Sequence, residues 1–125
     1  MAHKLAIMLL NIDPDRPHLC GSPFFQAASA AAMDCEVEIY FASRAVRLLV
    51  QGVADRIYPS DNKEKSVYGF MQEAARLGVK FLACKGALEA YAVTPENMIP
   101  EYSGTAGGTT FIGRVMDDEW KSLTY

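Results

Sequence analysis

The sequence predicts an α/β protein in which a parallel sheet of about five strands lies between two layers of helices. Three observations support this fold class. Short apolar segments of strand length alternate along the chain with segments of helical periodicity. Residues 5–10 are apolar throughout, which is typical of a strand buried on both faces of a parallel sheet. Strands joined by helices form right-handed βαβ units, so neighbouring strands are expected to run parallel.

Length and composition indicate one domain of ordinary globular type. The chain has 125 residues, enough for a hydrophobic core, so residues 1–125 are predicted to be a single domain. Half of the residues are hydrophobic and 22% are charged, as is usual for a soluble protein. The formal net charge is -3 and the Lys and Arg residues are scattered, whereas a nucleic-acid partner requires a basic stripe. We therefore expect no nucleic-acid partner.

A loop, a helix and a second strand are predicted after the first strand. Residues 11–21 are polar and contain two prolines and two aspartates. Ser22 offers a capping hydroxyl and Pro23 suits the first helical position, so a helix is expected to begin there and to continue through the alanine-rich residues 24–33. Residues 35–41 alternate between polar and apolar side chains until the end of the segment, which predicts the second strand.

The middle of the chain contains the clearest helical pattern. Ser43 is expected to cap a short helix over residues 44–50, which Gly52 terminates. Residues 54–65 are polar and turn-like. Residues 66–77 carry apolar side chains at helical spacing and form the best amphipathic helix in the sequence.

A third strand and a short helix are predicted next. Gly78 is a suitable C-terminal cap for the preceding helix. Residues 79–83 form the third strand, and residues 85–91 form a helix directly after it.

The last part of the chain is less regular. Residues 94–96 predict a short helical turn, and residues 99–102 predict a brief strand or an extended connector. Small residues at positions 103–110 lead into a helix over roughly residues 105–117, and residues 120–125 predict a closing strand.

The natural strand order for such a chain is flavodoxin-like. Ligand sites in open α/β sheets form outside the carboxyl ends of the strands, near the point where the strand order reverses. The loop of residues 11–21 and the turn of residues 84–86 follow the first and third strands, so both are expected at that edge of the sheet.

Cys84 is the leading candidate for a functional residue. It lies between the third strand and the following helix, where backbone N–H groups and the positive end of a helix dipole favour a thiolate. Lys85 adds a positive charge beside it. A thiolate here could attack, carry sulfur or sense oxidation. The alternative is a small buried apolar residue at a strand end, because free cysteine is among the most buried residue types.

The other thiols and the histidines are weaker candidates. Three cysteines without regular spacing favour reduced thiols over a disulfide framework. Cys20 could face Cys84 and act as a second thiol, or it could be a loop thiol under the helix start. Cys35, at the start of the second strand, is expected to be structural. His18 could tune Cys84 or could be solvated, and its spacing to the cysteines is not that of a metal site.

Two polar segments predict no separate chemistry. Residues 104–110 are rich in Gly and Thr but lack the Gly-Lys-Ser/Thr ending of a phosphate-binding loop, so a small-residue helix start is expected. Asp13, Asp15 and Arg16 are expected to be a solvated loop.

The apolar run at residues 5–10 is far too short for a membrane span and has no cleavage-site pattern, so we expect a cytoplasmic protein.

The order of landmarks resembles that of a known family over nearly the whole chain. The most specific motif is the strand end Gly78-Val79-Lys80-Phe81-Leu82-Ala83-Cys84, followed by a helix of small residues. The matching segments are residues 4–10, 41–52, 77–84, 87–93, 95–100 and 104–125. In their order and spacing they resemble the DsrE/DsrF-like family of small sulfur-relay proteins, which includes TusD-like proteins.

The resemblance implies a fold, an assembly and a function. It implies a flavodoxin-like domain that assembles into a homo-oligomer, a trimer or a hexamer. It also implies that Cys84 carries a persulfide, which one sulfur-relay protein supplies and another accepts. The residues Lys85-Gly86-Ala87 depart from the sequence that sulfur-relay members tend to have at this point.

The sequence therefore predicts a sulfur-carrier or sulfurtransferase-like protein, with Cys84 as carrier, Lys85 as an assisting charge and Cys20 as a second thiol. No dissociable cofactor or metal is expected. The alternative is a non-catalytic oligomeric interaction or regulatory module whose cysteine is structural or redox-sensitive. A third option is a nucleotide or other anion binder that uses the strand-end loops.

Overall fold

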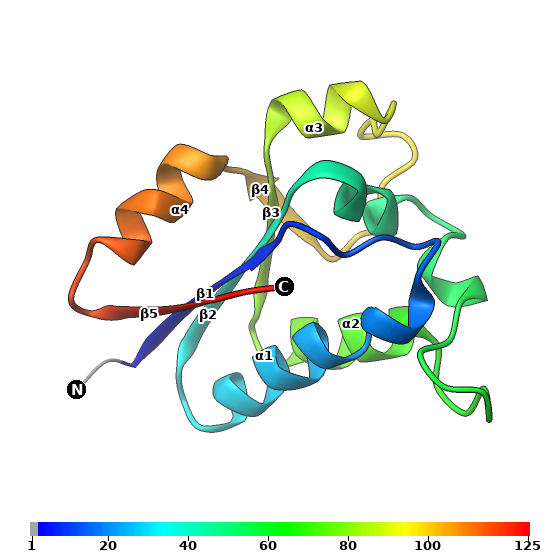
Figure 1. The fold of residues 1–125 in the computed structure, drawn as a ribbon, viewed down its shortest axis with the longest axis horizontal. Helices are drawn as coiled ribbons and strands as arrows, with labels where there is room; N and C mark the ends of the chain where they lie inside the picture. The colour runs from blue at the N-terminus through cyan, green and yellow to red at the C-terminus, as the bar shows by residue number, and fades with distance from the viewer. Residues whose placement is uncertain (1–2) are drawn as a thin grey trace.

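The computed structural model describes residues 3–125, which form a five-stranded sheet in which every strand pairing is parallel (Figure 1). This confirms the predicted α/β class. The strands are β1 (Lys4–Leu9), β2 (Glu36–Phe41), β3 (Lys80–Ala83), β4 (Tyr102–Thr105) and β5 (Trp120–Thr124).

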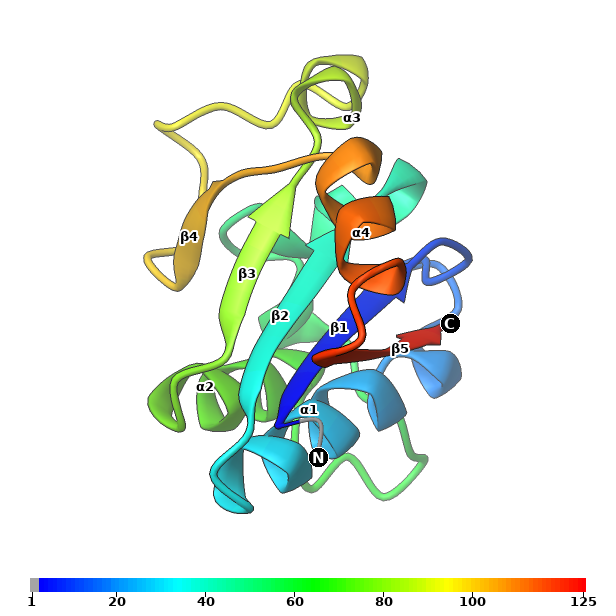
Figure 2. The ribbon, with the colours of Figure 1, turned by 90° about the vertical axis from the view of Figure 1, so that its left-hand side faces the viewer.

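Helices cover both faces of the sheet, but not equally. Figure 2 shows α1 and α2 together behind the sheet, α4 alone in front of it, and α3 beyond the carboxyl end of β3. The α-helices are α1 (Ser22–Ala32), α2 (Val67–Arg76), α3 (Lys85–Ala90) and α4 (Gly108–Val115), and the 3₁₀ helices are η1 (Pro17–Leu19), η2 (Ser43–Leu49) and η3 (Ala54–Arg56).

The strand order is β4-β3-β2-β1-β5. The first three crossovers therefore run in one direction, and only the connection through α4 returns to the other side of β1. In the flavodoxin order, 2-1-3-4-5, the reversal lies between β1 and β3. In this sheet it lies between β1 and β5, so the carboxyl end of β3 is not at the reversal point, contrary to expectation. The strand ends that precede residues 11–21 and 84–86 do share one edge, because the strands are parallel.

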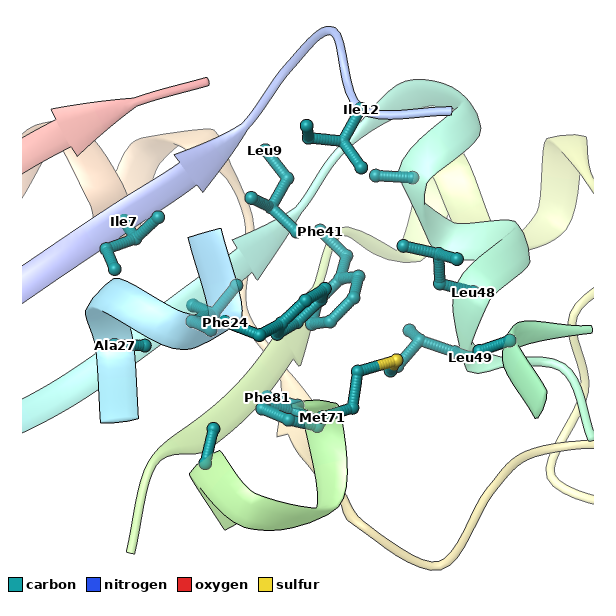
Figure 3. Packing of buried hydrophobic residues seen from close by; sticks show 14 of the residues in the cluster. Ile7, Leu9, Ile12, Phe24, Ala27, Phe41, Leu48, Leu49, Met71 and Phe81 are labelled. Carbon is teal, nitrogen blue, oxygen red and sulfur yellow. The ribbon is translucent and has the colours of Figure 1, made fainter. Parts of the chain in front are cut away.

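The main core lies between the sheet and the α1–α2 layer. Phe24 of α1 packs against Phe41 and Phe81, with ring centroids 6.0 and 5.9 Å away, and those two rings are 5.4 Å apart (Figure 3). All three side chains are fully buried or nearly so. Met71 of α2 belongs to the same core. Aromatic burial of this kind dominates the energetics of a core.

A second, smaller core and an ion pair hold α4 on the other face. Phe111 of α4 packs edge-on against Tyr40, with ring centroids 5.4 Å apart. Glu38 is buried below α4, and Arg114 donates to both of its carboxylate oxygens, at 3.0 and 3.2 Å. Tyr40 donates to Glu38 at 2.7 Å, and the Arg114 guanidinium lies 4.4 Å from the centroid of the Trp120 ring. The buried carboxylate is thus paired and hydrogen-bonded.

The predicted caps are only partly confirmed. Ser66 caps α2 by accepting from the Gly69 N–H at 3.0 Å. Gly78 ends α2 at φ 95°, where its N–H donates to Ala75, as predicted for a C-terminal glycine. Ser22 is wrong as a cap, because Gly21 occupies that position without a side-chain bond. Ser43 is also wrong as a cap, because it is the first residue of a 3₁₀ helix that is not side-chain capped.

The final third of the chain differs most from the prediction. Strand β4 covers residues 102–105, not 99–102, and α4 begins at Gly108, not near Thr105. The reason is tertiary: Gly104 and Thr105 pair with Leu82 and Ala83, so part of the small-residue stretch becomes a strand.

We expect Phe24→Ala to lower the free energy of unfolding by about 4 kcal/mol, because the truncated ring leaves a cavity between α1 and the sheet. Urea denaturation measures this change. The control is Phe25→Ala, at an adjacent side chain that is 61% exposed. It should change stability by no more than about 0.5 kcal/mol. Equal losses in the two variants would contradict the assignment of the core.

The Glu38 ion pair predicts a pH-dependent stability. Burial by itself would raise the pKa of Glu38, but the hydrogen bonds from Arg114 and Tyr40 outweigh it and hold this pKa below its ordinary value of 4.5. The charged pair therefore contributes fully above that value and is lost as the pH falls through the lowered pKa. At pH 7, Glu38→Gln should cost about 2 kcal/mol of unfolding free energy.

This difference between wild type and Glu38→Gln should shrink when denaturation is repeated at acid pH, because the wild-type carboxyl is then neutral as well. Glu36→Gln, an exposed position on the same strand, is the matched control. If the difference in unfolding free energy between wild type and Glu38→Gln stays constant down to pH 2, the charge of Glu38 does not stabilise the fold.

Candidate functional site

Cys84 lies at a strand-to-helix junction, as the sequence predicts. β3 ends at Ala83, Cys84 is the N-cap residue of α3 with extended φ and ψ of −73° and 133°, and its carbonyl accepts the Leu88 N–H at 3.1 Å. Its side chain makes no capping hydrogen bond. The residue is partly exposed, so the thiol is neither sealed in the core nor fully solvated.

The connection from β4 to α4 lies against Cys84. The Ala106 N–H donates to the Ala83 carbonyl at 3.0 Å and so extends the β3–β4 pairing beyond β4. The next residue, Gly107, is the N-cap of α4. A Cβ atom built on Gly107 would be 3.7 Å from the Cys84 Sγ. From the sequence, the Gly- and Thr-rich segment is predicted only as a small-residue helix start, and its position beside the thiol is a finding of the structure. The one signal in the sequence is that this segment lies between a predicted strand and a predicted helix.

Two helix starts therefore adjoin the thiol. Cys84 caps α3, and α4 begins next to Gly107. The first N–H groups of a helix have no partner within the helix and carry the positive end of its dipole, which favours an anion nearby. Lys85 is exposed and lies 3.9 Å from Glu89, so its charge faces solvent and is partly balanced. The geometry thus places the partly exposed Cys84 sulfur beside the start of α3 and the residue that precedes α4.

Cys20 does not have the environment of a second reactive thiol. Its side chain is 0% exposed and belongs to the main core. Its Sγ lies 3.4 Å from the Asp13 carbonyl and 3.6 Å from the Arg16 carbonyl, so the S–H can donate to either. Burial raises the pKa of the Cys20 thiol to about 11. A thiol that stays protonated and inaccessible is poorly suited to resolve an oxidised partner, so the structure favours the other expectation for Cys20, a loop thiol under the helix start.

His18 belongs to a different part of the surface. It lines a cavity of about 320 Å³ with Asn11, Leu19, Ser22 and Tyr125, at the β1 and β5 ends where the strand order reverses. The structure therefore does not support His18 as a tuning group for Cys84. Among residues 3–125, no group of three or more His, Cys, Asp or Glu side chains is arranged to hold a metal ion.

The loop after β1 is held by ion pairs. Arg44 lies 2.7 Å from Asp13 and 2.6 Å from Asp15, and Arg47 lies 3.4 and 3.2 Å from the same two carboxylates. The hydrogen bond from Arg47 and the charges of both arginines hold the pKa of Asp15 below its usual value. The sequence predicts a solvated loop, and the pairing is not apparent from it because the partners are about thirty residues apart. The acidic partners also compensate the arginines, which weakens the case for an anion site at these loops.

Cys35 lies at the opposite end of the sheet. It follows Asp34, which adopts a positive φ of 65° at the end of α1, and its N–H donates to the Ala30 carbonyl at 3.1 Å. It packs against the main core and is partly exposed. Its place just before β2, and thus at the amino end of the sheet, separates it from Cys84.

Comparisons with known proteins agree on the fold. A model of the DsrE/DsrF-like family matches residues 7–125. The protein of unknown function MTH1491 from Methanobacterium thermoautotrophicum is a similar solved structure, with a TM-score of 0.66, 18% sequence identity and 98% of each chain covered. The ychN protein from E. coli is similar with a TM-score of 0.75 and 10% identity, over 98% of this chain and 99% of the other. At these identities the two structures show a shared fold. A search of curated proteins finds no match.

None of the helices within residues 3–125 has the length and apolar character needed to cross a membrane.

The unequal environments of Cys84 and Cys20 predict selective labelling. Iodoacetamide at pH 7.5, applied to the native protein, should alkylate Cys84 and leave Cys20 unmodified, because Cys20 is buried and its pKa of about 11 keeps it protonated. Peptide mass mapping measures both sites. Labelling in denaturant, where all three cysteines react, is the control. Comparable native rates at Cys20 and Cys84 would contradict the assignment.

Proposed function

Because the chain belongs to the DsrE/DsrF-like family, we propose that it is a small sulfur-carrier or sulfurtransferase-like protein that carries a persulfide on Cys84 and passes it to a partner. The observation that carries this proposal is the position of Cys84. A partly exposed thiol lies at the carboxyl end of β3, next to two helix starts, and this position supports its proposed role as the persulfide-bearing cysteine.

The proposed reaction is an exchange between a thiolate and a persulfide. The Cys84 thiolate attacks the outer sulfur of a donor persulfide, a new S–S bond forms at Cys84, and the donor leaves as a thiolate when its own S–S bond breaks. An acceptor thiolate then attacks the outer sulfur on Cys84, takes it with its proton, and releases the Cys84 thiolate. Each step exchanges one S–S bond for another, so no external oxidant or reductant is consumed and no dissociable cofactor is needed.

The surroundings of Cys84 suit this exchange. Cys84 is the attacking group in the first step and the leaving group in the second, so its partial exposure at the end of β3 supports access for both donor and acceptor. The starts of α3 and α4 lie beside Cys84, and Lys85 adds an exposed positive charge. Cys20 has no part in the proposed mechanism, because it is buried.

The proposal includes partners and an assembly. Donor and acceptor would be other sulfur-relay proteins, with no nucleic acid or membrane involved, in the cytoplasm. The chain itself would form a homo-oligomer, a trimer or a hexamer, as the family resemblance implies.

One observation favours the alternative, a non-catalytic oligomeric interaction or regulatory module. Three exposed apolar side chains lie at the end of α4: Ile112 and Val115 of the helix and its C-cap residue Met116, with 56%, 42% and 77% of their surface exposed. Their spacing places them on one face of the helix, and such a face is suited to contact with another protein surface. In this function Cys84 would be structural or redox-sensitive only.

Sulfur loading separates the two functions. Incubation of the reduced protein with a persulfide donor, followed by intact-mass analysis, should add one sulfur atom to the wild type and none to Cys84→Ser. The reason is that Cys84 is the proposed carrier of the transferred sulfur. Reduction of the loaded protein with dithiothreitol should restore the original mass, which distinguishes a persulfide from over-oxidation.

Cys35→Ser is the matched control, because it removes the other partly exposed thiol and should load like the wild type. A sulfur that is still gained by Cys84→Ser would move the site to another cysteine. Failure of the wild type to gain sulfur would favour the interaction module.

A further inference from the structure

Two glycines adjoin the Cys84 sulfur from different parts of the chain. Gly86 is the second residue of α3, and Gly107 is the N-cap of α4. A Cβ atom built on Gly107 would be 3.7 Å from the Cys84 Sγ, and one built on Gly86 would be 3.8 Å from it. Both missing side chains therefore leave open space beside the same sulfur atom.

The backbone does not require glycine at either position. Gly107 has φ −107° and ψ −165°, an extended conformation that any residue adopts. Gly86 lies within a right-handed helix, where alanine is more favourable than glycine. Within residues 3–125 the glycines with positive φ are Gly52 and Gly78. Backbone conformation therefore does not explain why residues 86 and 107 are glycines. What the two glycines share is the space that each leaves beside Cys84.

A persulfide needs such space, whereas a free thiol does not. A methyl group 3.7 or 3.8 Å from Sγ would be in ordinary van der Waals contact with the thiol. The outer sulfur of a persulfide lies about 2.05 Å beyond Sγ. On the side of either glycine, it would come well inside the contact distance of an added methyl group. Alanine at these positions is therefore compatible with the thiol and crowds the persulfide.

We propose that Gly86 and Gly107 form a notch that accommodates the outer sulfur of a Cys84 persulfide and so make the site specific for sulfane sulfur, the transferable sulfur of persulfides and polysulfides. This inference rests on the proposed sulfur-carrier function and adds Gly107 as its main positioning residue. With a polysulfide, the Cys84 thiolate attacks the terminal sulfur, one S–S bond forms at Cys84, one breaks in the polysulfide, and the polysulfide leaves one sulfur shorter as an anion.

The test compares two neighbouring glycines at the same helix start. A Cβ on Gly107 would lie 3.7 Å from both the Cβ and the Sγ of Cys84, whereas one on Gly108 meets no atom within 4 Å. Wild type, Gly107→Ala and Gly108→Ala are incubated with inorganic polysulfide, and the gain of one sulfur is followed by intact mass. Gly108→Ala should load like the wild type. Gly107→Ala should load about tenfold more slowly, because crowding of this kind destabilises the loaded state.

A second readout separates loss of space from a change in the thiol itself. The pH at which iodoacetamide alkylation of Cys84 reaches half its maximal rate should be the same in Gly107→Ala and wild type, because a methyl group adds no charge. A shifted midpoint would mean that Gly107 acts on the ionisation of Cys84, and it would overturn the notch. Equal polysulfide loading in Gly107→Ala and wild type would also overturn it, while leaving the sulfur-carrier function intact.

Gly86→Ala keeps the proposal testable if Gly107→Ala does not fold. This variant should retain the fold, since alanine favours α3, and it should also load more slowly than the wild type. If Gly86→Ala loads normally but Gly107→Ala does not, only Gly107 forms the notch. If both variants load normally, the notch is refuted. If the wild type itself gains no sulfur, the proposed function fails and the notch fails with it.

Discussion

The contact among Phe24, Phe41 and Phe81 is the interaction on which the rest of this structure depends. Parallel strands cannot be joined by tight hairpins, so their order is held by the helices that cross over and pack on them. The three rings fasten α1 to β2 and β3 at centroid distances of 5.4–6.0 Å. Cys84 follows Phe81 by three residues at the end of β3. The position of the thiol at the carboxyl end of the sheet is therefore set by core packing and not by the turn that contains Cys84.

Within residues 3–125, the opposite face of the sheet is covered by α4, which has a contact near each end. Near its carboxyl end, Arg114 forms a two-bond pair with the buried Glu38, which defines the helix position more narrowly than apolar packing alone. At its amino end, Gly107 adjoins Cys84. The same helix thus links a structural ion pair in the middle of β2 to the environment of the thiol at the end of β3. A shift of α4 would therefore change both the ion pair and the surroundings of the thiol.

Location, rather than sequence neighbourhood, separates the chemistry of the three cysteines. Cys20 is sealed in the core, where burial raises its pKa to about 11. Cys35 lies at the amino end of the sheet, away from the strand ends where α/β sites form. Cys84 alone combines partial exposure, a strand-end position and two adjacent helix starts. The proposed relay therefore needs one thiol, and the alternative role as an oligomeric module would use the surface of α4 instead.

Local patterns in the sequence were sufficient for the fold class, for the helix that Gly78 ends, and for Cys84 at a strand-to-helix junction. These features depend on hydrophobic periodicity and on the conformational freedom of single residues, which act over a few positions. Tertiary structure alone decided the strand order, the conversion of Gly104 and Thr105 into strand, the burial of Cys20 and the approach of Gly107 to Cys84. Each of these features depends on pairing or packing between segments far apart in the chain. Local sequence patterns do not determine which distant segments come into contact.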